Sequence, residues 1–201
     1  IQSRIHHLIP LDSHVGESGM YNIRSLYFDD YYNRCYYENE NGTDPREKFR
    51  IRIYNHSPER ISLECKQKRQ GKTLKTACPL SLDQTNRLLK NQALSLDEAN
   101  LPLLRKLTLQ MKTRMLHPVV IVEYDRIPFV YPTGNVRITL DTNISSSTAI
   151  DSFLDEQIPK RPVQALGRQL LEVKYDEFLP DFIFTHPIAM RHKQMKTDFP
   201  H

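Results

Sequence analysis

The sequence predicts an α+β fold in which a pair of helices interrupts a series of antiparallel strands. Segments that alternate apolar and polar residues, at the two-residue period of a strand, occupy most of residues 21–78 and return in residues 119–175. Residues 81–111 between them instead carry leucines at the three- and four-residue spacing of a helix. Strands therefore follow strands on either side of the helices, without the strand–helix alternation of a parallel sheet.

Length and composition favour one folded domain, which we expect to span residues 1–201. The chain has 201 residues, 39% apolar and 26% charged, so a disordered, collagen-like or coiled-coil protein is excluded. No apolar run approaches the roughly 20 residues of a membrane span, and no basic-then-apolar leader opens the chain. Three cysteines at unrelated spacings argue against a zinc site or a disulfide framework. We therefore expect a cytoplasmic protein without a membrane segment.

The amino-terminal part of the chain is predicted to contain one helix and four strands. Ile5, Leu8 and Ile9 share helical spacing within Gln2–Leu11, where Pro10 stops the helix. Segments rich in aromatic and β-branched residues, separated by turn residues, then predict the strands Tyr21–Phe28, Lys48–Tyr54, Arg60–Gln67 and Thr73–Cys78.

The rest of the chain is predicted to form two helices, three strands and a short helix. Ser81 and Gln84 make a capping box that opens a helix to about Asn91. Pro102 suits the first turn of a second helix, which has four apolar residues on one face: Leu103, Leu104, Leu107 and Met111. The later elements are the strands Val119–Arg126, Asn135–Asp141 and Gln169–Tyr175 and the short helix Ala149–Leu154.

Positive charge is concentrated in one part of the chain. Residues 48–75 carry nine Lys or Arg against two Glu, a net charge of +7, whereas the whole chain carries only +4. On alternation, Lys48, Arg50 and Arg52 share one face of their strand and apolar residues the other. A solvent-exposed face of an ordinary antiparallel sheet explains any one such strand. However, similar rows of like charge recur on other strands, and these rows would repel one another without an anion between them.

A sheet curled with this charged face inward would form a cationic tube. Guanidinium and ammonium groups bind phosphate oxygens, and a carboxylate among them suits a divalent cation that bridges those oxygens. The residue pattern therefore predicts a site for a linear, multiply charged phosphate.

Seven motifs, in this order, resemble the VTC domain, the catalytic domain of the vacuolar transporter chaperone polyphosphate polymerase, which also occurs alone in prokaryotes. The motifs are Ser25-Leu-Tyr-Phe-Asp29, Lys48-Phe-Arg-Ile-Arg52, Leu63-Glu-Cys-Lys66, Gly71-Lys-Thr-Leu-Lys75, Val122-Glu-Tyr-Asp-Arg126, Val136-Arg-Ile-Thr-Leu-Asp141 and Leu171-Glu-Val-Lys174-Tyr-Asp-Glu-Phe-Leu-Pro180. The family belongs to the triphosphate tunnel metalloenzymes. The resemblance therefore implies an antiparallel β-barrel around a tunnel, with helices packed outside.

The resemblance also implies an enzyme that transfers the γ-phosphoryl group of ATP to inorganic polyphosphate with Mn²⁺ or Mg²⁺. The implied catalytic phosphate ligands are Arg50, Arg52, Lys66, Lys75, Arg126 and Arg137. Further substrate-binding residues are Lys48, Tyr124 and Lys174, and Glu172 is the implied metal ligand. Strict alternation puts Arg126 on the face opposite Glu123 and Asp125. The match therefore implies either that Tyr124 and Arg126 face the tunnel or that a β-bulge shifts the register of this strand.

Two departures from the family pattern concern the ends of the chain. The family's first strand would precede a helix like Gln2–Leu11, so the sequence is expected to be amino-terminally truncated and to lack this strand. The family's late Ser-Lys-aromatic motif is not intact, and Lys193 or Lys196 stands in for its lysine. The regulatory domain and membrane helices of the eukaryotic complex are absent from this sequence, which leaves a membrane-bound or regulatory partner open.

Other readings remain beside the polymerase. The same binding groups suit a tunnel hydrolase of tripolyphosphate or nucleoside triphosphates, or a polyphosphate-binding module without catalysis. Nucleic acid is not an expected partner, because no interleaving of aromatic and basic residues appears. Arg24 is expected in a structural ion pair, and Lys68, Arg69 and Lys72 suit either a solvated hairpin tip or a tunnel mouth.

Overall fold

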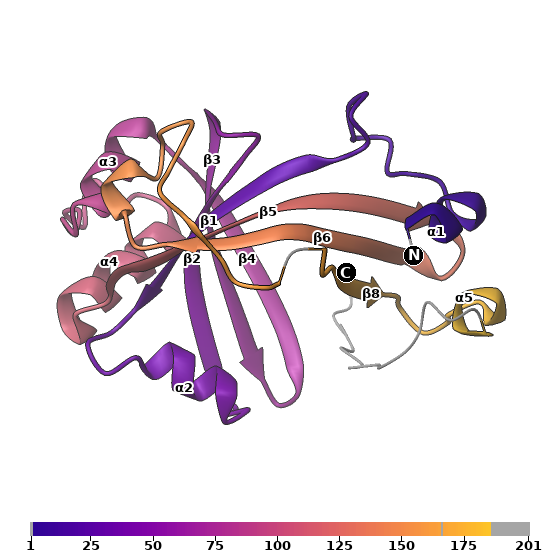
Figure 1. Cartoon of the computed structure of the whole chain (residues 1–201). Helices are drawn as coiled ribbons and strands as arrows, with labels where there is room; N and C mark the ends of the chain where they lie inside the picture. The colour runs from indigo at the N-terminus through magenta and orange to yellow at the C-terminus, as the bar shows by residue number, and fades with distance from the viewer. Residues whose placement is uncertain (1, 166, 186–201) are drawn as a thin grey trace.

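The computed structural model describes residues 2–165 and 167–185, and the sheet in this part of the chain has eight antiparallel strands (Figure 1). The strand order is β4-β3-β2-β1-β5-β6-β7, and β8 pairs with β6. The strands are β1 (Tyr21–Asp29), β2 (Arg46–Tyr54), β3 (Ser57–Arg69), β4 (Lys72–Leu80), β5 (His117–Tyr131), β6 (Val136–Ser147), β7 (Arg161–Pro162) and β8 (Leu170–Lys174).

The helices lie between and around these strands. They are α1 (Gln2–Leu8), α2 (Arg34–Glu40), α3 (Leu82–Leu89), α4 (Pro102–Arg114) and α5 (Asp181–Thr185), with 3₁₀ turns η1 (Thr133–Asn135) and η2 (Ile150–Ser152). The predicted capping box opens α3: the Ser81 hydroxyl accepts from the amide of Gln84 at 3.1 Å, and the Gln84 side chain accepts from the amide of Ser81 at 3.0 Å. Among the described residues, no helix is both long enough and apolar enough to cross a membrane.

Two apolar clusters cover the sheet face opposite the charged rows. The larger joins β1, β2 and β3 to α3 and α4 and includes Leu26, Ile51, Leu63, Leu88 and Leu107, all fully buried. The smaller lies where β5 and β6 extend beyond the other strands and packs them against α1 and α5. Burial of this apolar face dictates the register of each strand, and therefore turns the charged side chains to the other face.

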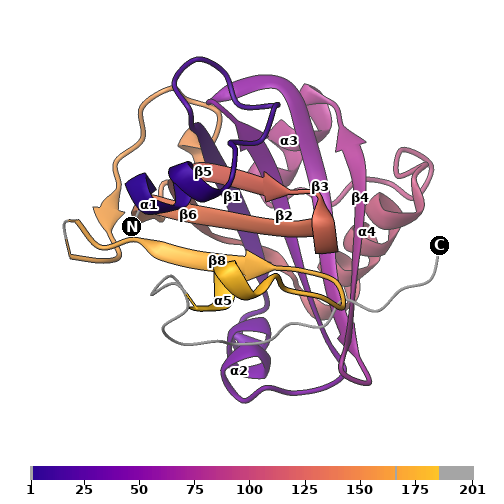
Figure 2. The ribbon, with the colours of Figure 1, turned by 90° about the vertical axis from the view of Figure 1, so that its right-hand side faces the viewer.

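The sheet curls so that strands distant in its order face one another. Four strands separate β3 from β8, so a flat sheet would hold them about 24 Å apart at ~4.8 Å per step. However, the pKa of Lys66 on β3 is lowered by burial, by Lys48 and then by Lys174 of β8, with Glu172 of β8 opposing the shift. In Figure 2, β5, β6 and β8 run roughly horizontally, whereas β2, β3 and β4 run roughly vertically. This strong twist of the sheet brings β8 over the charged face.

These features confirm the predicted α+β architecture, an antiparallel sheet curled around a charged face with helices outside. In the described part of the chain, hydrogen bonds do not close the sheet between its outer strands β4 and β8. Several predicted bounds are corrected. The first helix ends at Leu8, because Pro10 and Asp12 bond to β5 instead, through Val130 N to Pro10 O at 3.1 Å and Asp12 N to Pro128 O at 3.0 Å. The predicted helix at Ala149–Leu154 is only the 3₁₀ turn η2.

Candidate functional site

The strand register sets cations side by side on the concave face of the sheet. Lys48 of β2 lies opposite Lys66 of β3, which lies opposite Lys75 of β4. One step further along β2, Arg50 lies between Tyr27 of β1 and Glu64 of β3. The alternating sequence pattern predicted that the basic residues of each of these strands share one face.

Glu64 is the centre of this arrangement. Its Oε2 accepts from Nε and Nη2 of Arg50 at 2.7 and 2.6 Å, and its Oε1 lies 2.7 Å from Nζ of Lys75. Arg52 Nη1 is 3.8 Å from the same carboxylate. Burial acts to raise the pKa of Glu64, but these cations outweigh burial and hold the pKa below its ordinary value. One carboxylate therefore faces three cations, and the cluster keeps an excess of positive charge.

Hydroxyl groups on the neighbouring strands orient the two guanidinium groups. Arg50 Nη1 donates to the Tyr27 hydroxyl at 3.2 Å, and Arg52 Nε donates to Ser25 Oγ at 3.0 Å. Arg52 Nη2 also reaches the Tyr124 hydroxyl at 3.4 Å. Burial would raise the pKa of Tyr27, but Arg50 and then Arg52 and Lys48 lower it overall. The arginines are thus held in place before any anion binds.

The next wall of the site is formed by β5, whose Tyr124 and Arg126 lie on the concave face as the first alternative implied. The pairing of β5 with β1 is continuous from Glu123 to Arg126, so ordinary alternation turns Tyr124 and Arg126 to the concave face and Glu123 to the other face. The β5–β6 register shift between Glu123 and Asp125 places its extra residue on β6. Arg126 makes a two-bond ion pair with Asp141 of β6, through Nε and Nη2 at 2.7 Å each. Burial opposes this charge, but Asp141 raises the pKa of Arg126 above its usual value, and the guanidinium lies over the Tyr124 ring at 5.2 Å.

The third wall is formed by β6 and β8. Arg137 lies opposite Lys174, and Thr139 lies opposite Glu172. Glu172 is 3.3 Å from Lys174 Nζ and 3.9 Å from Arg126 Nη2, whereas Arg137 donates to Asp12 at 3.0 Å. Because Lys174 and Glu172 act on Lys66 across the curl of the sheet, this wall faces the β2–β4 wall.

The groups around Glu172 fit a hard divalent cation. The opposite residue, Thr139, is buried, and its hydroxyl has no hydrogen-bond partner within the described residues. A carboxylate and a free hydroxyl oxygen are ligands of the class that Mg²⁺ and Mn²⁺ prefer, and Mg²⁺ commonly takes only one or two carboxylates beside substrate phosphates. No cluster of three His, Cys, Asp or Glu residues with metal-binding geometry occurs in the described part of the chain.

The structure thus brings together most of the residues implied by the motif match. Those that lie on the concave face are Lys48, Arg50, Arg52, Lys66, Lys75, Tyr124, Arg126, Arg137, Glu172 and Lys174. Arg137 stands apart, because it is half exposed and its guanidinium is directed to Asp12. Lys193 and Lys196 lie outside the described residues.

Five residues of the site were not among the predicted ligands. Glu64, Thr139 and Asp141 could have been found from alternation, since each shares strand parity with predicted cations. Ser25 and Tyr27 had no such signal, because they belong to a strand whose composition is aromatic and apolar. Their role depends on the pairing of β1 with β2, which juxtaposes them to Arg52 and Arg50.

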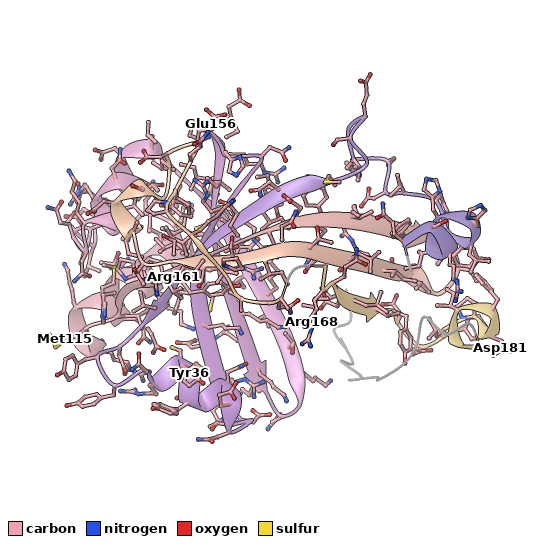
Figure 3. All side chains as sticks on the ribbon, in the orientation of Figure 1. Tyr36, Met115, Glu156, Arg161, Arg168 and Asp181 are labelled. Atoms are coloured by element: carbon pink, nitrogen blue, oxygen red, sulfur yellow. The ribbon has the colours of Figure 1, made fainter. Side chains whose placement is uncertain are left out.

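Arg24 lies on the opposite face and is the structural residue that the sequence indicated. It is 1% exposed and donates through Nε to Glu123 at 2.5 Å. Its other nitrogens donate to backbone carbonyls of Phe153, Asp155 and Glu156, in the loop marked by Glu156 in Figure 3. Arg24 therefore fixes this loop to the sheet and takes no part in the concave site.

Comparison with known proteins agrees with this fold. The family model of the VTC domain matches residues 1–197. A search of curated proteins found no match. Among solved structures, the chain is similar to a Bacillus halodurans protein described as a "putative adenylate cyclase", with a TM-score of 0.51 and 16% identity over 96% of this chain and 86% of that one. It is also similar to the PH1819 protein of Pyrococcus horikoshii OT3, with a TM-score of 0.40 and 14% identity over 71% and 64% of the two chains.

At this identity, the Bacillus halodurans structure supports the shared fold alone. The family model carries more weight, because it spans nearly the whole chain, including every strand that contributes to the concave face. The chain therefore belongs to the VTC domain family.

Proposed function

We propose that the protein is a metal-dependent polyphosphate polymerase that transfers the γ-phosphoryl group of ATP to a growing inorganic polyphosphate chain. The observation that carries this proposal is the excess of cations on a concave face: Arg50, Arg52 and Lys75 share the single carboxylate of Glu64. A site with this surplus is stabilised by a polyanion. A triphosphate and a polyphosphate chain both have a linear array of charged oxygens that suits it.

The proposed reaction needs no nucleophile from the protein. An oxygen of the terminal phosphate of the chain attacks the γ-phosphorus of ATP, the bond from that phosphorus to the β-phosphate bridging oxygen breaks, and ADP leaves. Charge spreads over the equatorial oxygens of the transferred group in the transition state. The Arg and Lys side chains align the two reactants and neutralise this charge.

Each wall has a distinct part in this proposal. Arg50 and Arg52, held by Tyr27 and Ser25, bind phosphate oxygens from one side. Arg126, held by Asp141, binds from another. Glu172 and the Thr139 hydroxyl would hold Mn²⁺ or Mg²⁺, which when bound neutralises the phosphate oxygens between the walls.

Incubation with ATP and Mn²⁺, followed by separation of the products by size, tests the proposal. We expect long chains and ADP from the protein, and a loss of roughly 10²–10³-fold in rate for Arg50→Ala, by analogy with removal of one transition-state donor. Glu172→Gln should reduce the rate and raise the metal concentration needed for half-maximal activity. Arg105→Ala is the matched control, because this arginine is exposed on the opposite side of the sheet, in α4.

Two results would replace the proposal with another function. Orthophosphate as the only phosphate product would identify a tunnel hydrolase, in which water attacks. Binding of tripolyphosphate without turnover at any metal concentration would identify a binding module. Unchanged turnover in both Arg50→Ala and Glu172→Gln would remove the proposed site.

A further inference from the structure

A second cationic feature begins at one end of the concave face and extends beyond it. It is a groove of about 750 Å³ at the end of the sheet where α2 and the β3–β4 turn are close together in both ribbon views (Figures 1 and 2). Six basic side chains line it: Arg34, Arg46, Lys68, Arg69, Lys72 and Arg114. We call this feature the basic groove.

The positive charge of the groove is neutralised only in part. Arg34 is paired with Asp30 at 2.9 Å, and the two acidic lining residues are Glu38 and Glu47. Glu47 is already engaged by Lys106 of α4, by Gln67 at 2.9 Å and by Gln110 at 3.2 Å. Within the described residues, the side chains of Arg69, Lys72 and Arg114 make no hydrogen bond or ion pair, and all three are exposed.

The basic groove continues the cationic rows of the proposed active site. Arg46 of β2 lies opposite Lys68 of β3, and the next pair on the same face of these strands is Lys48 opposite Lys66. Two residues of a strand span about 6.8 Å. A row of cations at this spacing therefore leads along β2 from Arg52 and Arg50 through Lys48 to Arg46, and into the groove.

The groove is also held in shape before any ligand binds. The Asp44 carboxylate accepts from the amides of Gln70 and Gly71 at 2.9 and 2.7 Å, which fixes the β3–β4 turn against the loop before β2. Arg46 Nη1 donates to the carbonyl of Thr43 at 2.8 Å in the same loop. The groove thus has a fixed position relative to the concave face.

We propose that the basic groove binds the distal part of an inorganic polyphosphate chain whose reacting end lies on the concave face. This inference rests on the proposed polymerase function and gives the chain a direction. At the opposite end of the molecule, near α1, the Arg137 guanidinium is instead paired with Asp12 at 3.0 Å. A long chain therefore leaves the site along β2 and β3, between α2 and the end of α4.

The test compares two triple variants of the full chain. Arg69→Gln/Lys72→Gln/Arg114→Gln removes three charges from the groove and leaves the concave face intact. Arg4→Gln/Lys90→Gln/Arg105→Gln removes the same charge from exposed positions away from the groove and the concave face. Binding of tripolyphosphate and of long-chain polyphosphate of defined length is measured by calorimetry at several salt concentrations, with Mg²⁺ present and ATP absent.

The groove variant should bind the long chain about tenfold or more weakly at low salt and tripolyphosphate as tightly as the wild type. Its log–log salt slope for the long chain should fall by about 2, because three phosphate contacts each release roughly 0.7 of a counterion on a flexible polyanion. The control variant should behave as the wild type in both respects. In polymerisation assays, the groove variant should release shorter chains.

Several outcomes separate this inference from the proposed function. If the protein makes no polyphosphate but the groove variant still loses affinity for long chains, the polymerase proposal is wrong, whereas the basic groove is confirmed as a binding site for polyphosphate. If the groove variant binds and extends long chains as the wild type does, the groove inference is wrong. Loss of affinity for single-stranded RNA or for anionic lipid vesicles, with affinity for polyphosphate retained, would equally overturn it.

Discussion

Two Arg–Glu pairs occupy equivalent places in the sheet and have opposite consequences. Arg24 lies directly across from Glu123 on β1 and β5, and Arg50 lies directly across from Glu64 on β2 and β3. The first pair is on the apolar face and is almost fully buried, with side chains 1% and 2% exposed. The second is on the concave face, where Arg50 is 24% exposed.

The difference between them lies in how completely the charges are satisfied. Each guanidinium nitrogen of Arg24 has an acceptor, from Glu123 or from a backbone carbonyl of the loop that it anchors. Around Glu64, three cations share one carboxylate, and two of them, Arg50 and Lys75, remain accessible from the concave side. The first arrangement is complete without a ligand and stabilises the fold. The second is incomplete, and its surplus charge is the property that an anion site requires.

The largest expected effect is on stability, from Arg24→Ala. This change leaves three carbonyls without a donor and removes a buried partner of Glu123, so it should lower the free energy of unfolding by about 3–5 kcal/mol. Arg50→Ala should cost about 1 kcal/mol or less, because its pair is partly exposed and Glu64 keeps Lys75. Urea unfolding of both variants measures the contrast, and equal losses would contradict the division between a structural and a functional pair.

The second effect separates activity from stability at Lys66. Burial and neighbouring ammonium groups lower its pKa from the ordinary 10.5, so the charged form costs stability in the folded state. This cost is present below the folded pKa and disappears as the pH rises towards the unfolded value. Lys66→Met should therefore raise the urea midpoint at pH 7 while it reduces polymerisation by on the order of 10²-fold.

Measurements across pH make this prediction sharper. The gain in stability of Lys66→Met over wild type should shrink as the pH approaches 10.5, and Lys90→Met, at an exposed position, should show neither effect. A lower urea midpoint for Lys66→Met at pH 7 would mean that the ammonium stabilises the empty site, against the surplus-charge argument.

The third effect concerns the carboxylate that the cations share. Glu64→Gln should lower the free energy of unfolding of the empty protein by about 1–3 kcal/mol, because Arg50 and Lys75 lose their charged acceptor. Without the Glu64 charge, Arg50 and Lys75 should bind tripolyphosphate more tightly. The anion should therefore raise the stability of the variant more than that of the wild type, since the stabilisation by a ligand grows with the logarithm of its affinity. Thermal unfolding with and without the anion compares the two proteins.

The pH dependence of Glu64→Gln follows from the lowered pKa of Glu64. A carboxyl whose folded pKa lies below its ordinary 4.5 contributes stability above that value and loses it as the pH falls through the folded pKa. The stability difference between wild type and Glu64→Gln should therefore be constant above about pH 5 and should narrow below it. A difference that widened in acid would contradict the assignment of Glu64 as the ionised centre of the cluster.

The sequence alone was sufficient to predict those features of the fold and the site for which local periodicity and charge pattern agree. The rows on β2 and β3 follow from strict alternation, and the capping box at Ser81 and Gln84 depends on neighbouring residues only. On β5, motif matching identified which of the two alternating faces is the concave one, the face that carries Tyr124 and Arg126. In each case the information lies within a few residues of chain.

The central position of Glu64 could not be predicted in the same way, because it depends on pairing between three strands. Glu64 meets Arg50 through the β2–β3 register and Lys75 through the β3–β4 pairing. Similarly, Thr139 meets Glu172 only because β8 returns to pair with β6 after a long connection. These contacts depend on strand pairing and on the curl of the sheet, and local sequence patterns contain no information about either.

The smallest expected effect is at Tyr124, which borders both arginine clusters. Its hydroxyl accepts from Arg52 Nη2 at a long 3.4 Å, whereas its ring lies under the guanidinium of Arg126 at 5.2 Å. Tyr124→Phe keeps the ring, so it should raise the KM for ATP only about two- to fivefold, less than 1 kcal/mol, with kcat unchanged. Tyr124→Ala removes the cation–π contact as well and should have a larger effect. If Tyr124→Phe were as damaging as Tyr124→Ala, the hydroxyl would contact substrate directly, and the concave face would bind phosphate by more than its surplus of positive charge.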